Sequence, residues 1–322
     1  AARGGAGMEA NQILIDLGKT MERMLTMPQS DFRRLLVIPA DGGAPPELPD
    51  ELRLSTYNFS QIGGFMLRSQ LDCIHRGNKI FDLKTRATHA IRHAGRLGDA
   101  KKEPNKRYLD FIHYRIVQQK GLFYSFEREF YDMMRSCFLK YSFQLRIGRM
   151  DGAFVTYHNT REIFGFQYLT LDTIDTATFG SPHMASVYFD TAVKLLDIVL
   201  QRVVARLGSE RPIRLTIQPL PQTKARPVLL VQAQPVVAEN RIPPPPGLGN
   251  KEDVRNELRV GDTTAWFLWV TTKVNGKDAP QPWMLSPEDQ LEVRYELEER
   301  TPQGKRIVAS VPPPAAATAS AE

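Results

Sequence analysis

Residues 67–87, LRSQLDCIHRGNKIFDLKTRA, hold two runs of β-forming residues on either side of the loop His75-Arg76-Gly77-Asn78. Two such runs around a glycine-containing loop predict a β-hairpin. We expect its arms at Phe65–Ile74 and Lys79–Thr85. The hairpin would bring residues that are separated by the loop side by side.

Charged side chains fall on one face of this predicted hairpin. Lys84 follows Asp82 by two positions, so both project from the same face of a strand, while Leu83 points into a core on the other. If the loop has an odd number of residues centred on Gly77, Asp72 lies directly opposite Asp82. A two-residue turn would instead place Asp72 on the other face.

Two facing carboxylates repel each other unless a cation lies between them. A hard divalent ion such as Mg²⁺ or Mn²⁺ suits carboxylate oxygens. Asp72, Asp82 and Lys84 therefore fit a phosphodiester-hydrolysing site, in which metal and lysine stabilise the developing charge. The alternative is an ordinary ladder of Asp–Lys ion pairs across an exposed hairpin.

A third carboxylate lies on the helix predicted for residues 8–25. The apolar residues of that segment recur at helical spacing, and Glu22 lies at the edge of their stripe, one turn after Gly18. A carboxylate that faces a core is costly unless it meets a metal or another cation. Glu22 therefore either joins the acidic pair or extends to solvent.

Cationic residues follow the hairpin directly, namely Arg86, His89, Arg92, His93 and Arg96. This cluster either contacts phosphates or forms the solvated face of a basic helix. Further along, Arg146 and Arg149 flank Gly148 in a predicted loop, where they are further candidates for contact with a phosphate.

The composition is that of a folded chain with a moderate positive charge. It has 322 residues, 42% of them hydrophobic and 24% charged, which is enough for about two domains. The formal charge of +6 and the pI of about 9.3 favour an acidic partner, either nucleic acid or an anionic membrane surface. No long apolar run predicts a membrane span. Cys73 and Cys137 lack the spacing of a zinc site or a disulfide framework.

Periodicity places further elements along the chain. We expect helices at Phe123–Leu145, ended by Gly148, and at Val187–Leu207; a second hairpin at Gly152–Tyr157 and Glu162–Leu171; and strands at Arg211–Gln218, Thr264–Lys273 and Leu291–Leu297.

Proline-rich segments predict the domain boundaries. Residues 241–250, RIPPPPGLGN, are expected to be a linker, and residues 311–322, VPPPAAATASAE, a disordered tail. The prediction is therefore an α/β domain over residues 8–240 and a small β-rich domain over residues 251–310.

The order of helix, hairpin with Asp…Asp-x-Lys, helix and strand resembles the PD-(D/E)xK nuclease superfamily. Longer strings resemble, more specifically, a fungal mitochondrial RNA-processing and RNA-degradation family of that superfamily. They are MEANQILIDLGKTMERMLTM (8–27), RSQLDC (68–73), FDLKTRA (81–87), SFEREFYDMMRSCFLKYSFQLRIGRMDGAFV (125–155) and EIFGFQYLTLD (162–172). KVNGKDAPQPWMLSPEDQLEVRYEL (273–297) is similar to that family's C-terminal region.

The resemblance implies a PD-(D/E)xK nuclease-like core, a mixed sheet flanked by helices, in a metal-dependent exoribonuclease. It further implies 5′-to-3′ direction, 5′-end processing and degradation of RNA in the mitochondrial matrix, and association with the mitochondrial RNA polymerase and degradosome at the inner membrane.

Matched to the motif, Asp72, Asp82 and Glu22 would bind Mg²⁺ or Mn²⁺, and Lys84 would orient the water or stabilise charge. Leu71 stands where the motif has proline. Arg86, Arg92, Arg146 and Arg149 are the candidates for RNA binding.

Two other functions remain open. A non-catalytic adaptor would hold RNA in the same basic groove as a scaffold for the polymerase or degradosome, but it has no need of a repulsive acidic pair. A DNA-repair exonuclease would use the same chemistry. Cleavage of matched RNA and DNA strands distinguishes a ribonuclease from a DNA-repair exonuclease, because only RNA has the 2′-hydroxyl.

Overall fold

The computed structural model describes the chain over residues 5–36, 56–75, 77–93, 113–220, 227–242, 255–279, 285–300 and 306–311. The chain separates into two compact units, Ala1–Ala185 and Ser186–Glu322. The candidate hairpin and the elements around it belong to the first unit.

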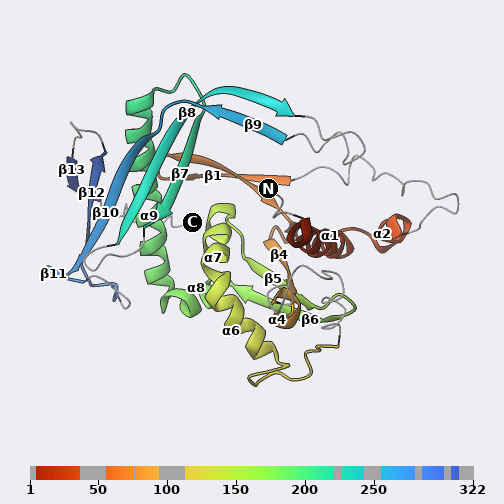
Figure 1. Ribbon diagram of the computed structural model, residues 1–322. Coiled ribbons are helices and arrows are strands. Elements are labelled where there is room, and N and C mark those ends of the chain that lie inside the picture. Colours follow the sequence, from red (N-terminus) through yellow and green to blue (C-terminus); the bar gives the residue numbers. More distant parts are fainter. Residues whose placement is uncertain are drawn as a thin grey trace. The chain divides into compact units, whose positions relative to one another are not determined.

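A mixed β-sheet is the centre of the first unit (Figure 1). The elements of the first unit are α1 (Gly5–Thr26), α2 (Gln29–Leu36), β1 (Thr56–Ile62), β2 (Phe65–Leu71), β3 (Cys73–Ile74), β4 (Ile80–Ala87), α4 (His89–His93), α6 (Phe126–Ser136), α7 (Phe138–Gly148), β5 (Gly152–His158), β6 (Ile163–Thr170) and α8 (Leu171–Phe179). The sheet order is β3-β4-β5-β6. β4 and β5 are parallel and the other pairs antiparallel. Parallel neighbours need a crossover connection, and the chain between β4 and β5 includes α4, α6 and α7. The mixed α/β architecture predicted for this region is confirmed.

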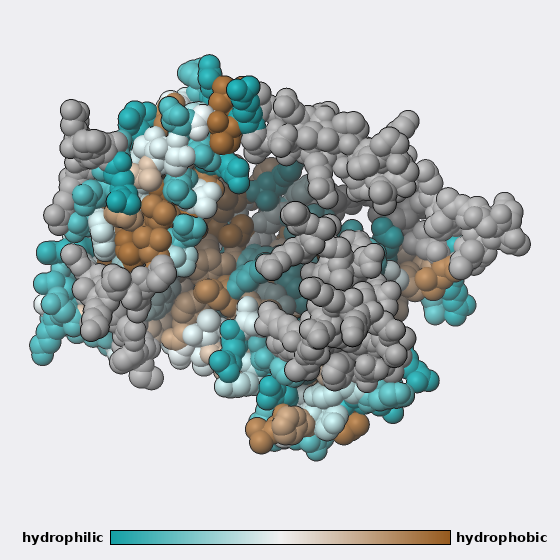
Figure 2. Space-filling model, in the orientation of Figure 1, coloured by the Kyte–Doolittle hydropathy of each residue, from teal (hydrophilic) through white to brown (hydrophobic). Residues whose placement is uncertain are grey.

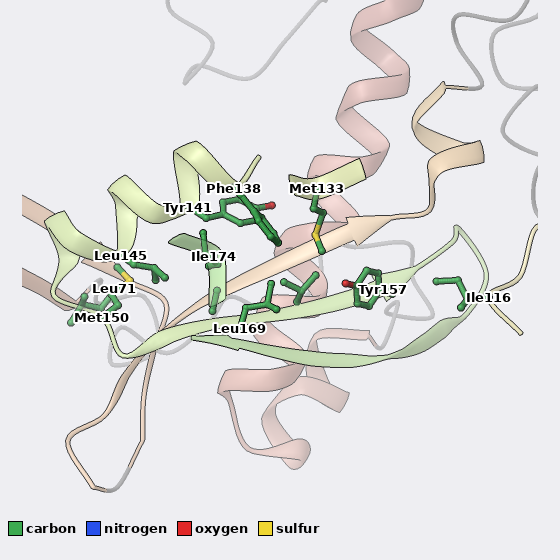
Figure 3. Close-up of a cluster of buried hydrophobic side chains, with 12 residues drawn as sticks. Leu71, Ile116, Met133, Phe138, Tyr141, Leu145, Met150, Tyr157, Leu169 and Ile174 are labelled. Carbon is green, nitrogen blue, oxygen red and sulfur yellow. The ribbon is translucent and has the colours of Figure 1, made fainter. Parts of the chain in front are cut away.

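The hydrophobic core of the first unit lies between α7 and the strands. Figure 3 shows Phe138, Tyr141 and Leu145 of α7 pointing toward the strands that carry Tyr157 and Leu169. Each of these side chains is almost fully buried. Burial of one such side chain contributes about 1.5–3 kcal/mol, so α7 is held firmly over one face of the sheet.

The predicted first arm, residues 65–74, is divided between two sheets. Its first part, β2, pairs with β1, a strand that the sequence analysis does not predict, and only β3 pairs with β4. The division falls at Asp72, which lies between β2 and β3. β1 and β2 form a separate two-stranded ribbon that turns at Gly63, whose φ of 56° suits glycine.

The helix predicted for residues 123–145 is in fact two helices, α6 and α7, that meet at Cys137. Cys137 has φ −125° and ψ −26°, outside helical values. Ser136 Oγ donates to the carbonyl of Asp132, 2.6 Å away, and this bond to the preceding turn bends helices. Gly148 was expected to end the helix, but it is still helical, and the left-handed residue is Arg149.

The second unit contains a large antiparallel sheet and one long helix. Its elements are α9 (Pro182–Leu207), which begins just before the unit boundary, β7 (Ile213–Pro219), β8 (Val228–Ile242), β9 (Arg255–Val260), β10 (Thr264–Val274), β11 (Lys277–Asp278), β12 (Leu291–Glu299) and β13 (Arg306–Ser310). The order is β13-β12-β10-β8-β7, with β9 on β8 and β11 on β10. A turn at Asn275-Gly276 connects β10 to β11, with positive φ at both residues.

This sheet places the domain boundary earlier than the sequence analysis does. β7 and β8 were assigned to a domain ending near residue 240, yet they pair with each other, and β8 pairs with β10. Hydrogen bonds across the sheet therefore join both sides of the proline-rich segment, whose residues 243–250 lie outside the described residues. Residues 312–322 of the expected tail also lie outside them.

An apolar pocket of about 220 Å³ lies between α9 and the strands β10 and β12, lined by residues that include Leu195, Val270 and Val293. Figure 2 shows hydrophobic side chains gathered in the part of the view where Figure 1 draws α9 and these strands. None of the helices in the described part of the chain is long and apolar enough to cross a bilayer.

Candidate active site

The two aspartates of the hairpin meet as the odd-numbered loop requires. The register of the β3–β4 pair is centred on Gly77, so Asp72, directly before β3, lies opposite Asp82. Asp72 Oδ2 also accepts a hydrogen bond of 3.0 Å from the backbone N–H of Leu83. The carboxylate thus takes the place of a backbone partner for β4 at the residue just before β3 begins. The predicted register is confirmed.

Asp82 is buried, with a side-chain exposure of 1%, and its principal partner is Lys84. Lys84 Nζ lies 2.7 Å from both carboxylate oxygens and donates to Oδ1. Oδ2 receives no hydrogen bond from the described residues. Lys84 Nζ also lies 5.6 Å from the centroid of the Tyr141 ring, a cation–π distance. Tyr141 lies within the helix predicted for residues 123–145, and its position in a helix gives no sign of this contact.

The surroundings of Asp82 disfavour its negative form. Burial is the largest cause that raises the pKa of Asp82, and the neighbouring Asp72, within hydrogen-bonding distance, raises it further against the lowering effect of Lys84. The result is a pKa of about 7, compared with 3.8 for an ordinary aspartate. Without a further cation, Asp82 therefore holds a proton part of the time at neutral pH.

Glu22 reaches this pair because α1 packs closely on β4. Gly18 makes the approach possible, since a Cβ at that position would lie 3.0 Å from Thr85 Oγ1. Glu22 is one turn further along and half-buried. Burial raises its pKa, Asp72 raises it further, and Lys84 lowers it. The structure therefore brings Glu22 into the same electrostatic cluster as Asp72 and Lys84.

The donor atoms of this cluster suit a hard divalent cation in part. The carboxylate of Asp82 shares the single ammonium of Lys84 between its two oxygens while it faces Asp72, and facing carboxylates are the ligands that Mg²⁺ and Mn²⁺ prefer. Within the described ranges, no three His, Cys, Asp or Glu side chains form a group that could hold a metal as they stand. Mg²⁺ commonly uses one or two carboxylates together with waters and substrate phosphates. Asp72 and Asp82 fit that pattern better than a three-carboxylate cage.

Arg86 and Arg92 are already engaged by carboxylates. Arg86, with 7% of its side chain exposed, lies 3.2 Å from Asp132 and donates to Cys137 Sγ at 3.3 Å. Arg92 pairs with Asp132 and, at 3.2 Å, with Glu129. These ion pairs hold β4 and α4 against α6. The predicted contact of Arg86 and Arg92 with phosphates stays a prediction, and the acids on α6 were not foreseen as their partners.

Arg146 and Arg149 have different environments. Arg146 makes a bidentate pair with buried Asp175, with distances of 2.9 and 2.8 Å, and also donates to Ser142. It ties α7 to α8, and its predicted contact with a phosphate stays a prediction. Arg149 is exposed at the end of α7, with φ 50°. Of the four predicted RNA-binding arginines, Arg149 keeps an accessible position.

Comparison with known proteins places the first unit in a family. The family described as "Mitochondrial protein Pet127" matches residues 5–201, which covers the first unit and most of α9. No solved structure matches the chain.

Two proteins from yeasts are similar to parts of this chain. The "mRNA degradation protein pet127, mitochondrial" of Schizosaccharomyces pombe is 36% identical over 194 residues, which is 59% of this chain and 34% of that protein. The "Putative mitochondrial translation system component PET127" of Saccharomyces cerevisiae is 44% identical over 131 residues, which is 40% of this chain and 16% of that protein. The chain thus spans about a third of the first relative and a smaller part of the second. The extent of the family match shows that the chain belongs to the Pet127 family of mitochondrial proteins.

Proposed function

We propose that the cluster of Asp72, Asp82, Glu22 and Lys84 catalyses metal-dependent hydrolysis of RNA phosphodiester bonds, as the exoribonuclease of a PD-(D/E)xK-like core in mitochondria. The observation that carries the proposal is the buried Asp82, which faces the carboxylate of Asp72 and has the ammonium of Lys84 as its one cationic partner among the described residues. Such an arrangement is unfavourable on its own and becomes favourable with a divalent cation.

Each residue has a distinct role in this proposal. Asp72 and Asp82 would hold Mg²⁺ or Mn²⁺, and Glu22, on the neighbouring helix, would accept a hydrogen bond from a water at the same site. A bound ion would supply a water of lowered pKa and polarise the phosphate. Lys84, positioned by Asp82 and by the Tyr141 ring, would donate to a phosphate oxygen as its charge develops.

RNA as substrate has support from a relative and from charge. The Schizosaccharomyces pombe relative is named an mRNA degradation protein. The positive net charge of this chain favours a polyanion. Direction of degradation is proposed as 5′-to-3′.

A non-catalytic RNA-binding adaptor is the second candidate. It is favoured by one observation, that the described residues contain no group of three side chains that could hold a metal as they stand. In that case the proton and Lys84 alone would balance the acidic pair, and the chain would hold RNA for the mitochondrial polymerase or degradosome without cutting it.

Degradation of a 5′-monophosphate RNA, labelled at either end, tests the two functions. Wild-type protein is compared with Asp82→Asn and with the control Asp172→Asn, which changes an exposed acid at the start of α8. We expect release of nucleotides from the 5′ end with Mg²⁺ or Mn²⁺, loss with EDTA, loss in Asp82→Asn and retention in the control. A DNA strand of the same sequence tests the choice of RNA. RNA binding without metal-dependent cleavage would overturn the enzyme in favour of the adaptor.

A further inference from the structure

The β1–β2 ribbon has one face pinned to the protein and one face open. Its residues alternate in exposure, as strands do. The open face carries Tyr57, Phe59, Gln61, Met66, Arg68 and Gln70. Among them Phe59 is 61% exposed, Met66 73% and Tyr57 40%. Large exposed apolar side chains that lie side by side on one surface mark an interaction site.

Hydrogen bonds fix the direction of this face. On the opposite face, Asn58 Nδ2 donates to the carbonyl of Gly148 and Ser60 Oγ donates to the carbonyl of Ile147, each at 2.9 Å. These two carbonyls belong to the C-terminal turn of α7, where carbonyl groups have no N–H partner within the helix. The ribbon is therefore anchored to the core, and its aromatic face cannot turn inward.

The charge of the ribbon suits a polyanion. Residues 56–71 contain no Asp or Glu, and Arg68 is their single charged residue. Its guanidinium carbon lies 4.5 Å over the centroid of the Tyr57 ring, so cation and aromatic surface are combined.

The ribbon also leads directly to the acidic pair. β2 ends at Leu71, and the next residue is Asp72. Arg68 is four positions before Asp72, a distance of about 13 Å along an extended strand, or two to three nucleotides of extended RNA. A strand held on the ribbon would have its end close to Asp72 and Asp82.

We propose that the open face of the ribbon binds single-stranded RNA, with bases stacked on Tyr57 and Phe59 and a phosphate contacted by Arg68. Stacking on aromatic side chains combined with positive charge is the usual means of binding single strands without sequence preference. The inference rests on RNA being the substrate in the proposed function, and it adds the path by which the strand reaches the acids.

Fluorescence anisotropy with a labelled 12-nucleotide RNA tests whether the open face of the ribbon is such an RNA-binding platform. The 322-residue protein carries Asp82→Asn, and EDTA is present, so that no RNA is cut during the measurement. Phe59→Ala and Tyr57→Ala are each expected to weaken binding about 10-fold. Phe59→Tyr keeps a stacking surface and should keep the affinity. Arg68→Gln should reduce the slope of log affinity against log salt by about 0.7, the value for one phosphate contact to a single strand.

Phe166→Ala is the matched control, because Phe166 is also a half-exposed phenylalanine on a strand of the first unit. It should leave RNA affinity unchanged. Duplex RNA, whose bases are already stacked, should bind the ribbon more weakly than the single strand. Affinities within twofold of the parent for both aromatic variants would overturn the platform. So would sedimentation that shows the ribbon pairing two copies of the chain, with dissociation in Phe59→Ala.

The outcomes for the platform and for catalysis are separable. If wild-type protein cuts RNA with metal while the ribbon variants bind normally, the platform fails and the nuclease stands. If the ribbon variants lose affinity while wild-type protein never cuts RNA, the platform stands and the nuclease fails.

Discussion

The two halves of β4 carry two buried ionic clusters on the same face of one strand, and they are balanced differently. In the first half, the two carboxylates of Asp72 and Asp82 meet the single ammonium of Lys84, and Glu22 interacts electrostatically with Asp72 and Lys84. In the second half, Arg86 and Arg92 face Asp132 and Glu129, so two guanidinium groups meet two carboxylates.

The pKa directions follow this balance. Burial and Asp72 raise the pKa of Asp82 to about 7. Burial also acts to raise the pKa of Asp132, but the hydrogen bond and charge of Arg92, with His89 and Arg86, outweigh it and lower the pKa. Buried charges that are paired become costly when one partner is removed, whereas a buried carboxylate whose pKa is raised by a like charge is a candidate functional group. This difference supports the proposal that the first half of β4 takes part in catalysis.

Asp82→Asn should produce the largest effect. The asparagine keeps the size of the side chain and removes the charge that would hold the ion. We expect metal-dependent cleavage of RNA to fall by at least ~10³-fold, since a bound ion contributes several kcal/mol to stabilising the transition state. Single-turnover cleavage at saturating Mg²⁺ measures it. Activity within tenfold of wild type would show that the surplus charge is not used for catalysis.

The stability of the metal-free protein should depend on pH through the same carboxylate. The pKa of Asp82 is higher in the folded protein than the ordinary 3.8, so its contribution to stability is complete below about pH 4 and is lost as pH rises through about 7. The shift bounds the loss at about 4 kcal/mol. Urea unfolding in EDTA at pH 5 and pH 8 measures it, with Asp82→Asn as reference. Mg²⁺ should restore stability at pH 8, and equal curves for both proteins would contradict the prediction.

Glu129→Gln sharpens the comparison from the other cluster. Glu129 is fully buried, pairs with Arg92 and accepts the backbone N–H of His89 at 2.6 Å. Removal of its charge leaves Arg92 partly unpaired and should lower the free energy of unfolding by about 3 kcal/mol. Cleavage per folded molecule should stay within twofold of wild type. Loss of activity without loss of stability would show that this cluster also takes part in the chemistry.

Local periodicity explains which parts of the site can be predicted from the sequence. The period of two along β4 places Asp82 and Lys84 on one face, and a loop centred on Gly77 brings Asp72 opposite. The helical period from Gly18 places Glu22 on the side of α1 that packs on β4. These relations span few residues or depend on one packing contact.

Partners distant in the sequence explain what cannot be predicted. Arg86 and Arg146 read as exposed cations because nothing near them in the chain is their partner, yet Asp132 and Asp175 fold onto them. In the same way, β8 gives no sign that it will pair with β10 beyond the proline-rich segment. Burial of an arginine is decided by long-range contacts, so a basic residue in a sequence predicts charge but not accessibility.

The contact between Lys84 and Tyr141 should give the smallest effect and tests whether the lysine is held in place. Tyr141→Phe keeps the ring under Lys84 Nζ, whereas Tyr141→Leu removes it. A cation–π contact of about 1 kcal/mol corresponds to about fivefold in the rate of cleavage, so Tyr141→Leu should be about fivefold slower and Tyr141→Phe close to wild type. The pH profile distinguishes positioning from general destabilisation: a displaced Lys84 pairs less well with Asp82, which moves the acidic limb of the profile upward in Tyr141→Leu alone. A slower Tyr141→Leu with an unchanged profile would mean that Tyr141 acts only through packing of α7.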